Sequence, residues 1–156
     1  MSENKPLVII ISGSKSDSEF VKATEEYLAY FQILYESKVL SAHRNPDQVV
    51  DYVSNARDNG VKCIIAQAGM AAHLAGVVAA HTTLPVIGVP LPGSHLNGVD
   101  SLYSTVQMPA GIPVATMAIG KAGARNAAVF AAEMLSVEDE SVHRRLEEFR
   151  ANGAKL

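Results

Sequence analysis

The sequence contains no tryptophan and only one cysteine, and aromatic residues make up just 6% of it. A single cysteine excludes an internal disulfide framework and a cysteine-based metal site. That residue, Cys63, lies in the apolar run 61–66 and is predicted to be a buried core residue. The net charge is −3 and no long basic run occurs, so nucleic acid is not an expected partner.

Long apolar segments are also missing. The polar stretch 1–6 lacks the apolar centre of a secretory signal peptide. No uncharged run free of turn residues reaches the roughly 20 residues that span a bilayer. We therefore expect no membrane partner and a cytoplasmic location. With 156 residues, the chain is predicted to form a single domain, 1–156, that can bury its own core.

Alanine, valine, isoleucine and glycine are plentiful, which is typical of a parallel sheet covered by closely packed helices. Five short apolar runs predict strands at 7–11, 33–40, 61–66, 85–89 and 114–119. Helical segments are expected at about 16–31, 46–59, up to 81, and at 99–107 and 120–135. This alternation predicts an α/β fold: a three-layer αβα sandwich on a flavodoxin-like, doubly wound parallel five-stranded sheet of order 2-1-3-4-5, plus a C-terminal helix.

The motif Ser-Ala-His-Arg-Asn-Pro, 41–46, lies between the second predicted strand and its helix. Asn45 and Pro46 are typical of a helix start, and Gln48 has capping-box spacing with Asn45. A hydroxyl, an imidazole and a guanidinium therefore lie at the carboxyl end of a strand, where parallel sheets bind ligands. An arginine fork beside a histidine favours a small phosphorylated substrate. An exposed polar turn, with both side chains merely solvated, is the alternative.

Two further turns are expected at the same edge of the sheet. Residues 12–18 offer serine hydroxyls and a helix start, which favour an anion, although such a cluster is more often a plain helix cap. Ser16 and Glu19 have capping-box spacing there. In the segment 67–76, a small-residue turn lets the backbone approach a ligand closely.

Two histidines lie on the helix that follows this third turn, and they are not equivalent. His73 stands just inside the turn and is a candidate for the site, whereas His81 is expected to be an ordinary helix-end histidine. Neither has an acidic or cysteine partner at ligand spacing, so no metal site is predicted.

In the predicted strand order these turns meet. Arg44 and the serine hydroxyls would hold a phosphate, and Asp17 could accept hydrogen bonds from ribose hydroxyls. His43 is then the nearby group able to give and take protons near neutral pH. The residues alone thus predict a phosphorylated small-molecule site with one acid–base histidine. The side chains and turn expected at this edge are Ser14, Asp17, Ser41, His43, Arg44, Gly69 and His73.

Five segments carry a more specific signal. They are GSKSDS (13–18), SAHRNP (41–46), QAGMAAHLAG (67–76), GVDSLYSTVQMPAGIPV (98–114) and AIGKAGARNAA (118–128). In this order they resemble the N5-carboxyaminoimidazole ribonucleotide mutase family of purine biosynthesis, over nearly the whole chain. The resemblance implies an isomerase that moves a carboxylate from the exocyclic nitrogen of an imidazole ribonucleotide to ring carbon four, without ATP, metal or organic cofactor. It also implies the same αβα fold, and homo-octamers with the sites at subunit junctions.

The resemblance also implies roles for individual residues. His43 would be the proton carrier, and the substrate-binding residues would be Ser14, Asp17, Ser41, Arg44, Ala68, Gly69, His73 and Leu74. The segment 67–76 departs from the family's common GAGGAAHLPG, because Gln67, Met70 and Ala75 replace two glycines and a proline. The bulky Met70 is expected either to point away from the pocket or to narrow it.

Two alternatives to the mutase remain open. One is a carboxylase that takes aminoimidazole ribonucleotide and carbon dioxide directly, although the AAHL run at 71–74 favours the mutase. The other is a non-catalytic nucleotide-binding module, since a fold alone does not fix a function.

The C-terminal segment, 137–156, is predicted to form an amphipathic helix with Val142, Leu146 and Phe149 as its apolar stripe. The five-stranded sandwich would be complete without it. We therefore predict that this helix packs on a neighbouring subunit, as the resemblance implies; folding back on its own subunit is the alternative. The alanine-rich helix before it is expected to be packed on both sides.

Overall fold

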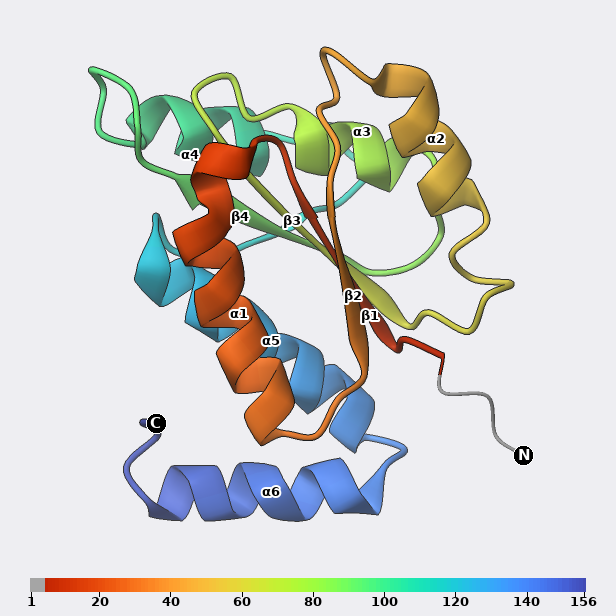
Figure 1. Cartoon of the computed structure of the whole chain (residues 1–156), viewed down its shortest axis with the longest axis vertical. Coiled ribbons are helices and arrows are strands. Elements are labelled where there is room, and N and C mark those ends of the chain that lie inside the picture. The colour runs from red at the N-terminus through yellow and green to blue at the C-terminus, as the bar shows by residue number, and fades with distance from the viewer. Residues whose placement is uncertain (1–4) are drawn as a thin grey trace.

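In the computed structural model, which describes residues 5–156, five parallel strands form a sheet in the order β2-β1-β3-β4-β5 (Figure 1). The strand order and the parallel pairing confirm the predicted flavodoxin-like sheet. The strands are β1 (Val8–Ser12), β2 (Tyr35–Val39), β3 (Cys63–Gly69), β4 (Val86–Leu91) and β5 (Ala115–Thr116).

Helices cover both faces of this sheet, which confirms the three-layer sandwich (Figure 1). One face carries α1 and α5, with α6 packed against them; the other carries α2, α3 and α4. None of the helices within 5–156 is long and apolar enough to cross a bilayer. Their bounds are α1 (Ser18–Tyr30), α2 (Pro46–Ser54), α3 (Leu74–Ala80), α4 (Val99–Val106), α5 (Lys121–Ser136) and α6 (Glu140–Ala151), with a 3-10 helix η1 (Lys15–Asp17) before α1.

The alternation of side chains along the strands divides the core into two halves. Ile9 and Ile11 of β1 pack beneath α2 and α3, whereas Val8 and Ile10 pack beneath α1 and α5. The strand is thus buried on both faces, as its continuous apolar run predicts. Cys63 is buried as predicted, and burial raises the pKa of its thiol to about 12, which keeps the thiol protonated and unreactive.

The second strand corrects the prediction of a buried strand at 33–40. β2 covers only 35–39, and its last three residues are exposed. The cause is its position: β2 is the outermost strand and pairs only with β1. Glu36 and Lys38 form an ion pair of 3.1 Å on this strand. Charged side chains on an edge strand discourage pairing with another chain.

Several other boundaries also differ from the prediction. β3 continues to Gly69 instead of ending at 66, because its last residues pair in register with the end of β4. β5 has two residues instead of six, and α2 ends at Ser54 rather than at 59. The extension of β3 matters most, since it makes the third turn shorter and ties it to the sheet.

The C-terminal helix folds back on its own chain. Phe149 packs against the rings of Tyr27, Tyr30 and Phe31 of α1 and its end, with centroid distances of 5.9, 5.7 and 5.3 Å. The stripe formed by Val142, Leu146 and Phe149 is buried within the chain. The argument that this stripe needs a neighbouring subunit is therefore wrong, because α1 and α5 already cover it. Whether the outer face of α6 also meets another subunit stays a prediction.

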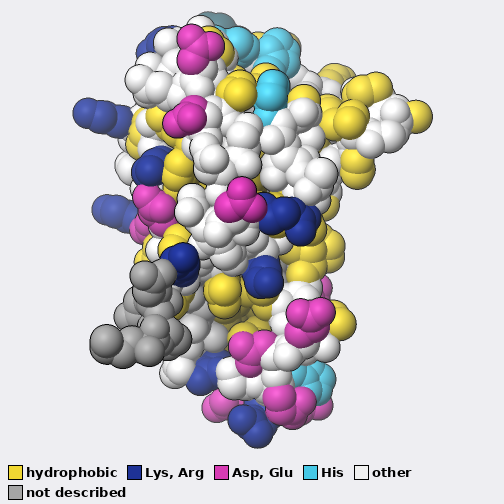
Figure 2. Space-filling model, turned by 90° about the vertical axis from the view of Figure 1, so that its right-hand side faces the viewer, with side chains coloured by type: hydrophobic (Ala, Val, Ile, Leu, Met, Phe, Trp, Pro, Cys, Tyr) yellow, Lys and Arg dark blue, Asp and Glu magenta, His cyan; other side chains and the backbone are white. Residues whose placement is uncertain are grey.

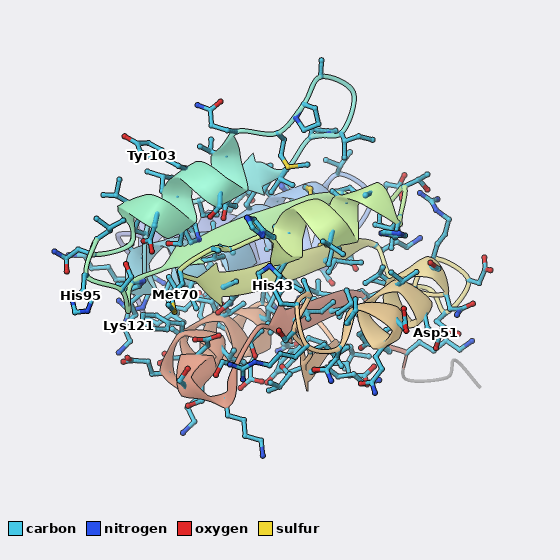
Figure 3. All side chains as sticks on the ribbon, turned by 90° about the horizontal axis from the view of Figure 1, so that it is seen from above. His43, Asp51, Met70, His95, Tyr103 and Lys121 are labelled. Atoms are coloured by element: carbon cyan, nitrogen blue, oxygen red, sulfur yellow. The ribbon has the colours of Figure 1, made fainter. Side chains whose placement is uncertain are left out.

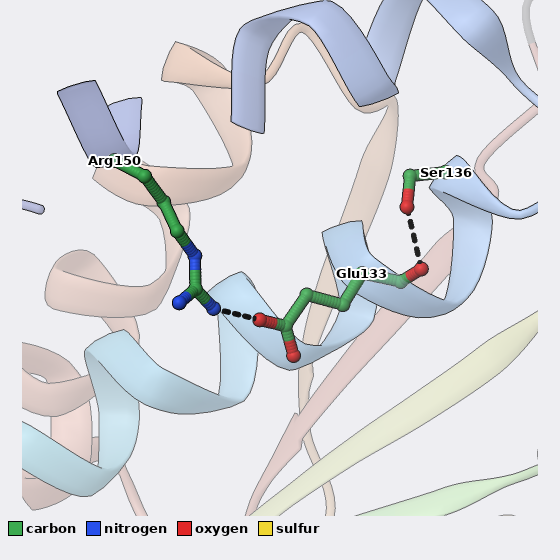
Figure 4. A network of polar contacts seen from close by, with 3 residues as sticks. All are labelled: Glu133, Ser136 and Arg150. Atoms are coloured by element: carbon green, nitrogen blue, oxygen red, sulfur yellow. Dashed lines mark hydrogen bonds and ion pairs between the residues drawn. The ribbon is translucent and has the colours of Figure 1, made fainter. Parts of the chain in front are cut away.

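Part of the surface of α5 is open in this chain. Arg125 and Asn126 are exposed, with Arg125 over the Tyr27 ring of α1, so α5 is not packed on all sides within one chain. Arg150 of α6 pairs with Glu133 of α5, whose carbonyl accepts a hydrogen bond from the Ser136 hydroxyl at 2.7 Å (Figure 4). This ion pair is largely exposed and contributes little to stability compared with the aromatic cluster.

Substitution of Phe149 tests whether α6 is part of the chain's own core. Phe149→Ala removes a ring that is 3% exposed, so the free energy of unfolding should fall by about 3–5 kcal/mol in urea titrations. The matched control is Val137→Ala, at a side chain that is 84% exposed, with an expected change within about 0.5 kcal/mol. Equal unfolding midpoints for the two variants would contradict the packing described here.

Candidate active site

The loops that follow β1, β2, β3 and β4 surround a cavity of about 390 Å³ at the carboxyl edge of the sheet. This volume lies within the usual range for small-molecule sites. All predicted site residues except His73 line it, and His73 contacts a lining residue directly. The lining residues are Gly13, Ser14, Ser16, Asp17, Ser41, Ala42, His43, Arg44, Ala68, Gly69, Met70, Ala71, Leu74, Pro92 and Gly93.

The first loop is held by Ser14 and Asp17. The Ser14 hydroxyl oxygen accepts hydrogen bonds from the Ser16 amide at 3.2 Å and from the Ser16 hydroxyl at 2.9 Å. The Asp17 carboxylate accepts the Ser14 amide at 3.0 Å, which completes a capping box. The box therefore joins Ser14 to Asp17 and starts η1, which corrects the expected pairing of Ser16 with Glu19.

Partial burial shifts the pKa of this carboxylate. Desolvation raises the pKa of Asp17, and hydrogen bonds from the Ser14 amide and the Ser16 hydroxyl oppose that rise. The Asp17 carboxylate is thus already hydrogen-bonded within its own loop in the absence of a ligand.

The second loop is held by Ser41. Its hydroxyl oxygen accepts the amides of His43 at 3.3 Å and Arg44 at 3.2 Å. Pro46 begins α2 as predicted, but the Asn45 side chain accepts the Ser41 amide at 3.4 Å and makes no capping bond to the helix. The predicted capping box between Asn45 and Gln48 is wrong, because the Asn45 side-chain oxygen accepts the Ser41 amide within the turn instead of capping α2.

These contacts make the serine hydroxyls of the site, Ser41 above all, hydrogen-bond donors toward a ligand. A hydroxyl has two acceptor lone pairs and one hydrogen. The Ser41 oxygen already accepts two backbone amides, so any further bond that it makes to a ligand is a donation. The Ser14 hydrogen is likewise free for a ligand when the Ser16 hydroxyl donates to the Ser14 oxygen. Donors of this kind, with the Arg44 guanidinium beside them, suit an anion such as a phosphate.

The two histidines of the site form a direct pair. Nε2 of His43 lies 2.9 Å from Nδ1 of His73, and the rings meet edge to face with centroids 5.0 Å apart. One nitrogen must donate while the other accepts, so the contact requires that at least one ring is neutral. Histidine side chains accordingly gather near the upper end of the molecule in the space-filling view (Figure 2).

The partner of His43 could not be found from sequence spacing. Only the pairing of β1 with both β2 and β3 brings residues 43 and 73 together, and the partner is an imidazole rather than the carboxylate of a usual triad. His81, as expected, lies at the end of α3, where its Nδ1 contacts the Val77 carbonyl oxygen at 2.8 Å.

The third loop is fastened to the neighbouring strand and to α4. A side chain on Gly69 would meet the Leu91 carbonyl oxygen at 3.2 Å, so the close approach made by this glycine is to β4. The buried Ala72 donates its amide to the Ser104 hydroxyl at 2.9 Å. The contact made by Ser104 was not predicted, because no sequence pattern indicates that a side chain of α4 reaches the loop after β3.

Gln67 and Met70 behave differently from each other. Gln67 is fully buried beneath the site, and its amide nitrogen donates to the Thr24 hydroxyl at 2.6 Å. Met70, in contrast, lines the cavity and is 62% exposed. Of the two outcomes expected for Met70, its position on the cavity wall favours narrowing of the pocket.

The cavity has a polar side and an apolar side. Its polar groups come from the first two loops, and its apolar side chains come mostly from the end of β3 and the segments that follow β3 and β4: Ala68, Ala71, Leu74 and Pro92. Within the described residues, no cluster of three or more His, Cys, Asp or Glu side chains could hold a metal ion. The arrangement can hold an anion on one side, keep water from the other and move a proton through the histidine pair.

Fold and site together define an α/β protein of flavodoxin-like topology with a small-molecule site at the point where the strand order reverses. The chain belongs to the AIR carboxylase family, whose model matches residues 7–155.

Relatives with high identity carry a more specific name. Proteins named N5-carboxyaminoimidazole ribonucleotide mutase from Bacillus subtilis strain 168 and Escherichia coli strain K12 are 56% and 49% identical to the chain. The matches cover 95% and 96% of this chain and 91% and 89% of those proteins. Among solved structures, that of Treponema denticola PurE superposes with a TM-score of 0.87 at 30% identity, covering 96% of this chain and 92% of that one.

Proposed function

We propose that this chain is an isomerase of purine biosynthesis that converts N5-carboxyaminoimidazole ribonucleotide into 4-carboxy-5-aminoimidazole ribonucleotide. The observation that carries the proposal is the position of His43. It lies in the cavity next to Arg44, and the serine donors lie around them. The high identity to proteins named as this mutase supports the same reaction.

In the first step, the bond between the exocyclic nitrogen and the carboxylate carbon breaks. The electron pair stays on nitrogen, carbon dioxide forms, and the nitrogen takes a proton. Ring carbon four, now electron-rich, then attacks the carbon dioxide. Loss of the proton on that carbon restores the aromatic ring, so no proton is consumed overall.

His43 can carry the proton in both directions, because an imidazole gives and takes protons near neutral pH. We infer that His73 orients His43 through their 2.9 Å contact. The two steps need no redox chemistry and no phosphoryl transfer, so the proposal includes no ATP, metal or organic cofactor.

The substrate-binding roles follow the two sides of the cavity. We propose that Arg44, Ser41 and Ser14 donate to the phosphate, and that Asp17 accepts from the ribose hydroxyls. Ala68, Gly69 and Leu74 would enclose the base and the migrating carboxylate. The fit is chemical: donors face the charged end of the substrate, and small apolar residues face the end where carbon dioxide forms.

The proposal is tested by an ultraviolet assay of the purified protein with the carbamate substrate, without added bicarbonate or ATP. The carboxylated imidazole should appear. His43→Asn should keep the fold but lower turnover by roughly 10²–10⁴-fold, the usual contribution of a general acid–base group.

The control for this variant is His143→Asn, on the exposed surface of α6, which should leave turnover unchanged. Product from aminoimidazole ribonucleotide and carbon dioxide, but not from the carbamate, would instead identify a carboxylase, the activity in the family's name. Ligand binding without turnover of either substrate would identify a binding module.

The phosphate role of Arg44 can be separated from the chemistry. Arg44→Lys keeps the charge but loses the bidentate fork, so affinity should fall more for the ribonucleotide than for its dephosphorylated nucleoside. Isothermal titration with both ligands measures the difference. Arg57→Lys, at a side chain that bonds Thr83 outside the cavity, is the matched control. Equal losses for both ligands would remove Arg44 from the phosphate site.

We also propose that the chain forms a homo-octamer, with its sites at subunit junctions, in the cytoplasm, where a purine-biosynthetic enzyme of this kind would act. An exposed apolar stripe on α4 supports assembly: Val99, Tyr103 and Val106 are 43%, 61% and 44% exposed. Tyr103 points outward from this helix (Figure 3).

The assembly proposal predicts the effect of a charge on that stripe. Tyr103→Asp should shift sedimentation velocity from an octamer to smaller species, because a carboxylate in an apolar interface is costly to desolvate. Lys155→Asp, at the exposed end of the chain, is the control. A wild-type protein that sediments as a monomer would refute the proposal, and an intact Tyr103→Asp octamer would exclude α4 from the interface.

A further inference from the structure

Met70 combines two unfavourable features. Its backbone adopts the left-handed conformation, with φ at 57°, a region that favours glycine. Its long apolar side chain is 62% exposed. Neither the fold nor the proton chemistry requires a bulky residue at this position, since a glycine would relieve the backbone and expose less apolar surface.

The surrounding contacts hold this conformation in place. On one side, Gly69 is the last residue of β3 and packs against the backbone of Leu91. On the other, the Ala72 amide is bound by the Ser104 hydroxyl at 2.9 Å. The strained residue is thus fixed between two anchored neighbours. Strain that persists at a cavity wall is typical of a residue kept for what it does to a ligand.

The position of Met70 shows what it would meet. It lines the same cavity as His43, and seen from above both lie at the edge where the strands end (Figure 3). Its neighbours on the wall, Ala71 and Leu74, belong to the apolar side. Methionine has a flexible, unbranched side chain that adapts its shape to what it covers.

We propose that Met70 is a covering residue: its side chain folds over the ligand and keeps carbon dioxide in the cavity until it bonds to ring carbon four. This inference rests on the proposed function. Without the cover, the nitrogen–carbon bond still breaks and the nitrogen still takes its proton. The carbon dioxide then escapes and is hydrated to bicarbonate, and free aminoimidazole ribonucleotide is released.

The test measures how often the carboxylate is lost. The substrate carries a ¹³C-labelled carboxylate, and the reaction runs in unlabelled bicarbonate buffer. The yield of labelled product per substrate consumed is compared among wild type, Met70→Gly and Met70→Leu. Spontaneous loss of carbon dioxide is measured in parallel without protein and subtracted. Met70→Gly should lower the labelled yield at least about twofold and accumulate aminoimidazole ribonucleotide, whereas Met70→Leu should stay close to wild type.

The melting temperature distinguishes a covering role of Met70 from a purely structural role. Glycine relieves the left-handed strain, so the melting temperature of Met70→Gly should rise by about 2 °C while its yield of labelled product falls. A structural role alone would move stability and yield in the same direction.

The possible results distinguish failure of the covering role from failure of the proposed mutase activity. Wild-type protein that makes no carboxylated imidazole from the carbamate overturns both. Normal wild-type turnover with the same labelled yield in Met70→Gly overturns the covering role alone. A Met70→Leu variant that loses as much label as Met70→Gly also overturns it, because bulk and apolarity would then not matter.

Discussion

The site depends on one feature of the sheet, the parallel pairing of β1 with two neighbours. Ser12, at the end of β1, lies opposite Val39 of β2 and Gln67 of β3, so the three following loops start at the same edge. No local contact could bring His43 to His73 across thirty residues. The cavity, the histidine pair and the division into a polar and an apolar side all follow from this alignment.

The loops at that edge are organised before a ligand binds. Asp17 holds the Ser14 amide, and Ser41 holds the amides of His43 and Arg44. The two bonds that Ser41 accepts from the backbone fill the acceptor sites of its oxygen and leave its hydrogen for a ligand. The same hydrogen bonds therefore order these loops and prepare them to bind an anion. The entropy of the loops is largely lost during folding rather than on ligand binding.

The sequence predicts the fold and most of the site because both depend on local signals and one topological rule. Apolar runs locate the strands, and the strand order gathers Ser14, His43 and Gly69 at one edge. The predictions that failed concern tertiary contacts, which leave no periodic pattern in the sequence. The exposure of β2 follows from its edge position, the fold-back of α6 follows from the fit of Phe149 among the rings of α1, and the Ser104 contact follows from the placement of α4.

Two unfavourable features of the chain lie near the end of β3. The Gln67 side-chain oxygen is buried without a hydrogen-bond partner among the described residues, and the backbone of Met70 adopts the left-handed conformation. Each feature costs free energy of folding. The compensation lies elsewhere, in strands buried on both faces and in the aromatic cluster that α6 completes around Phe149. That cluster is built on α1 and α6, and it does not touch the cavity. A chain arranged in this way can tolerate a costly loop at its site, because part of its stability comes from an aromatic cluster that does not line the cavity.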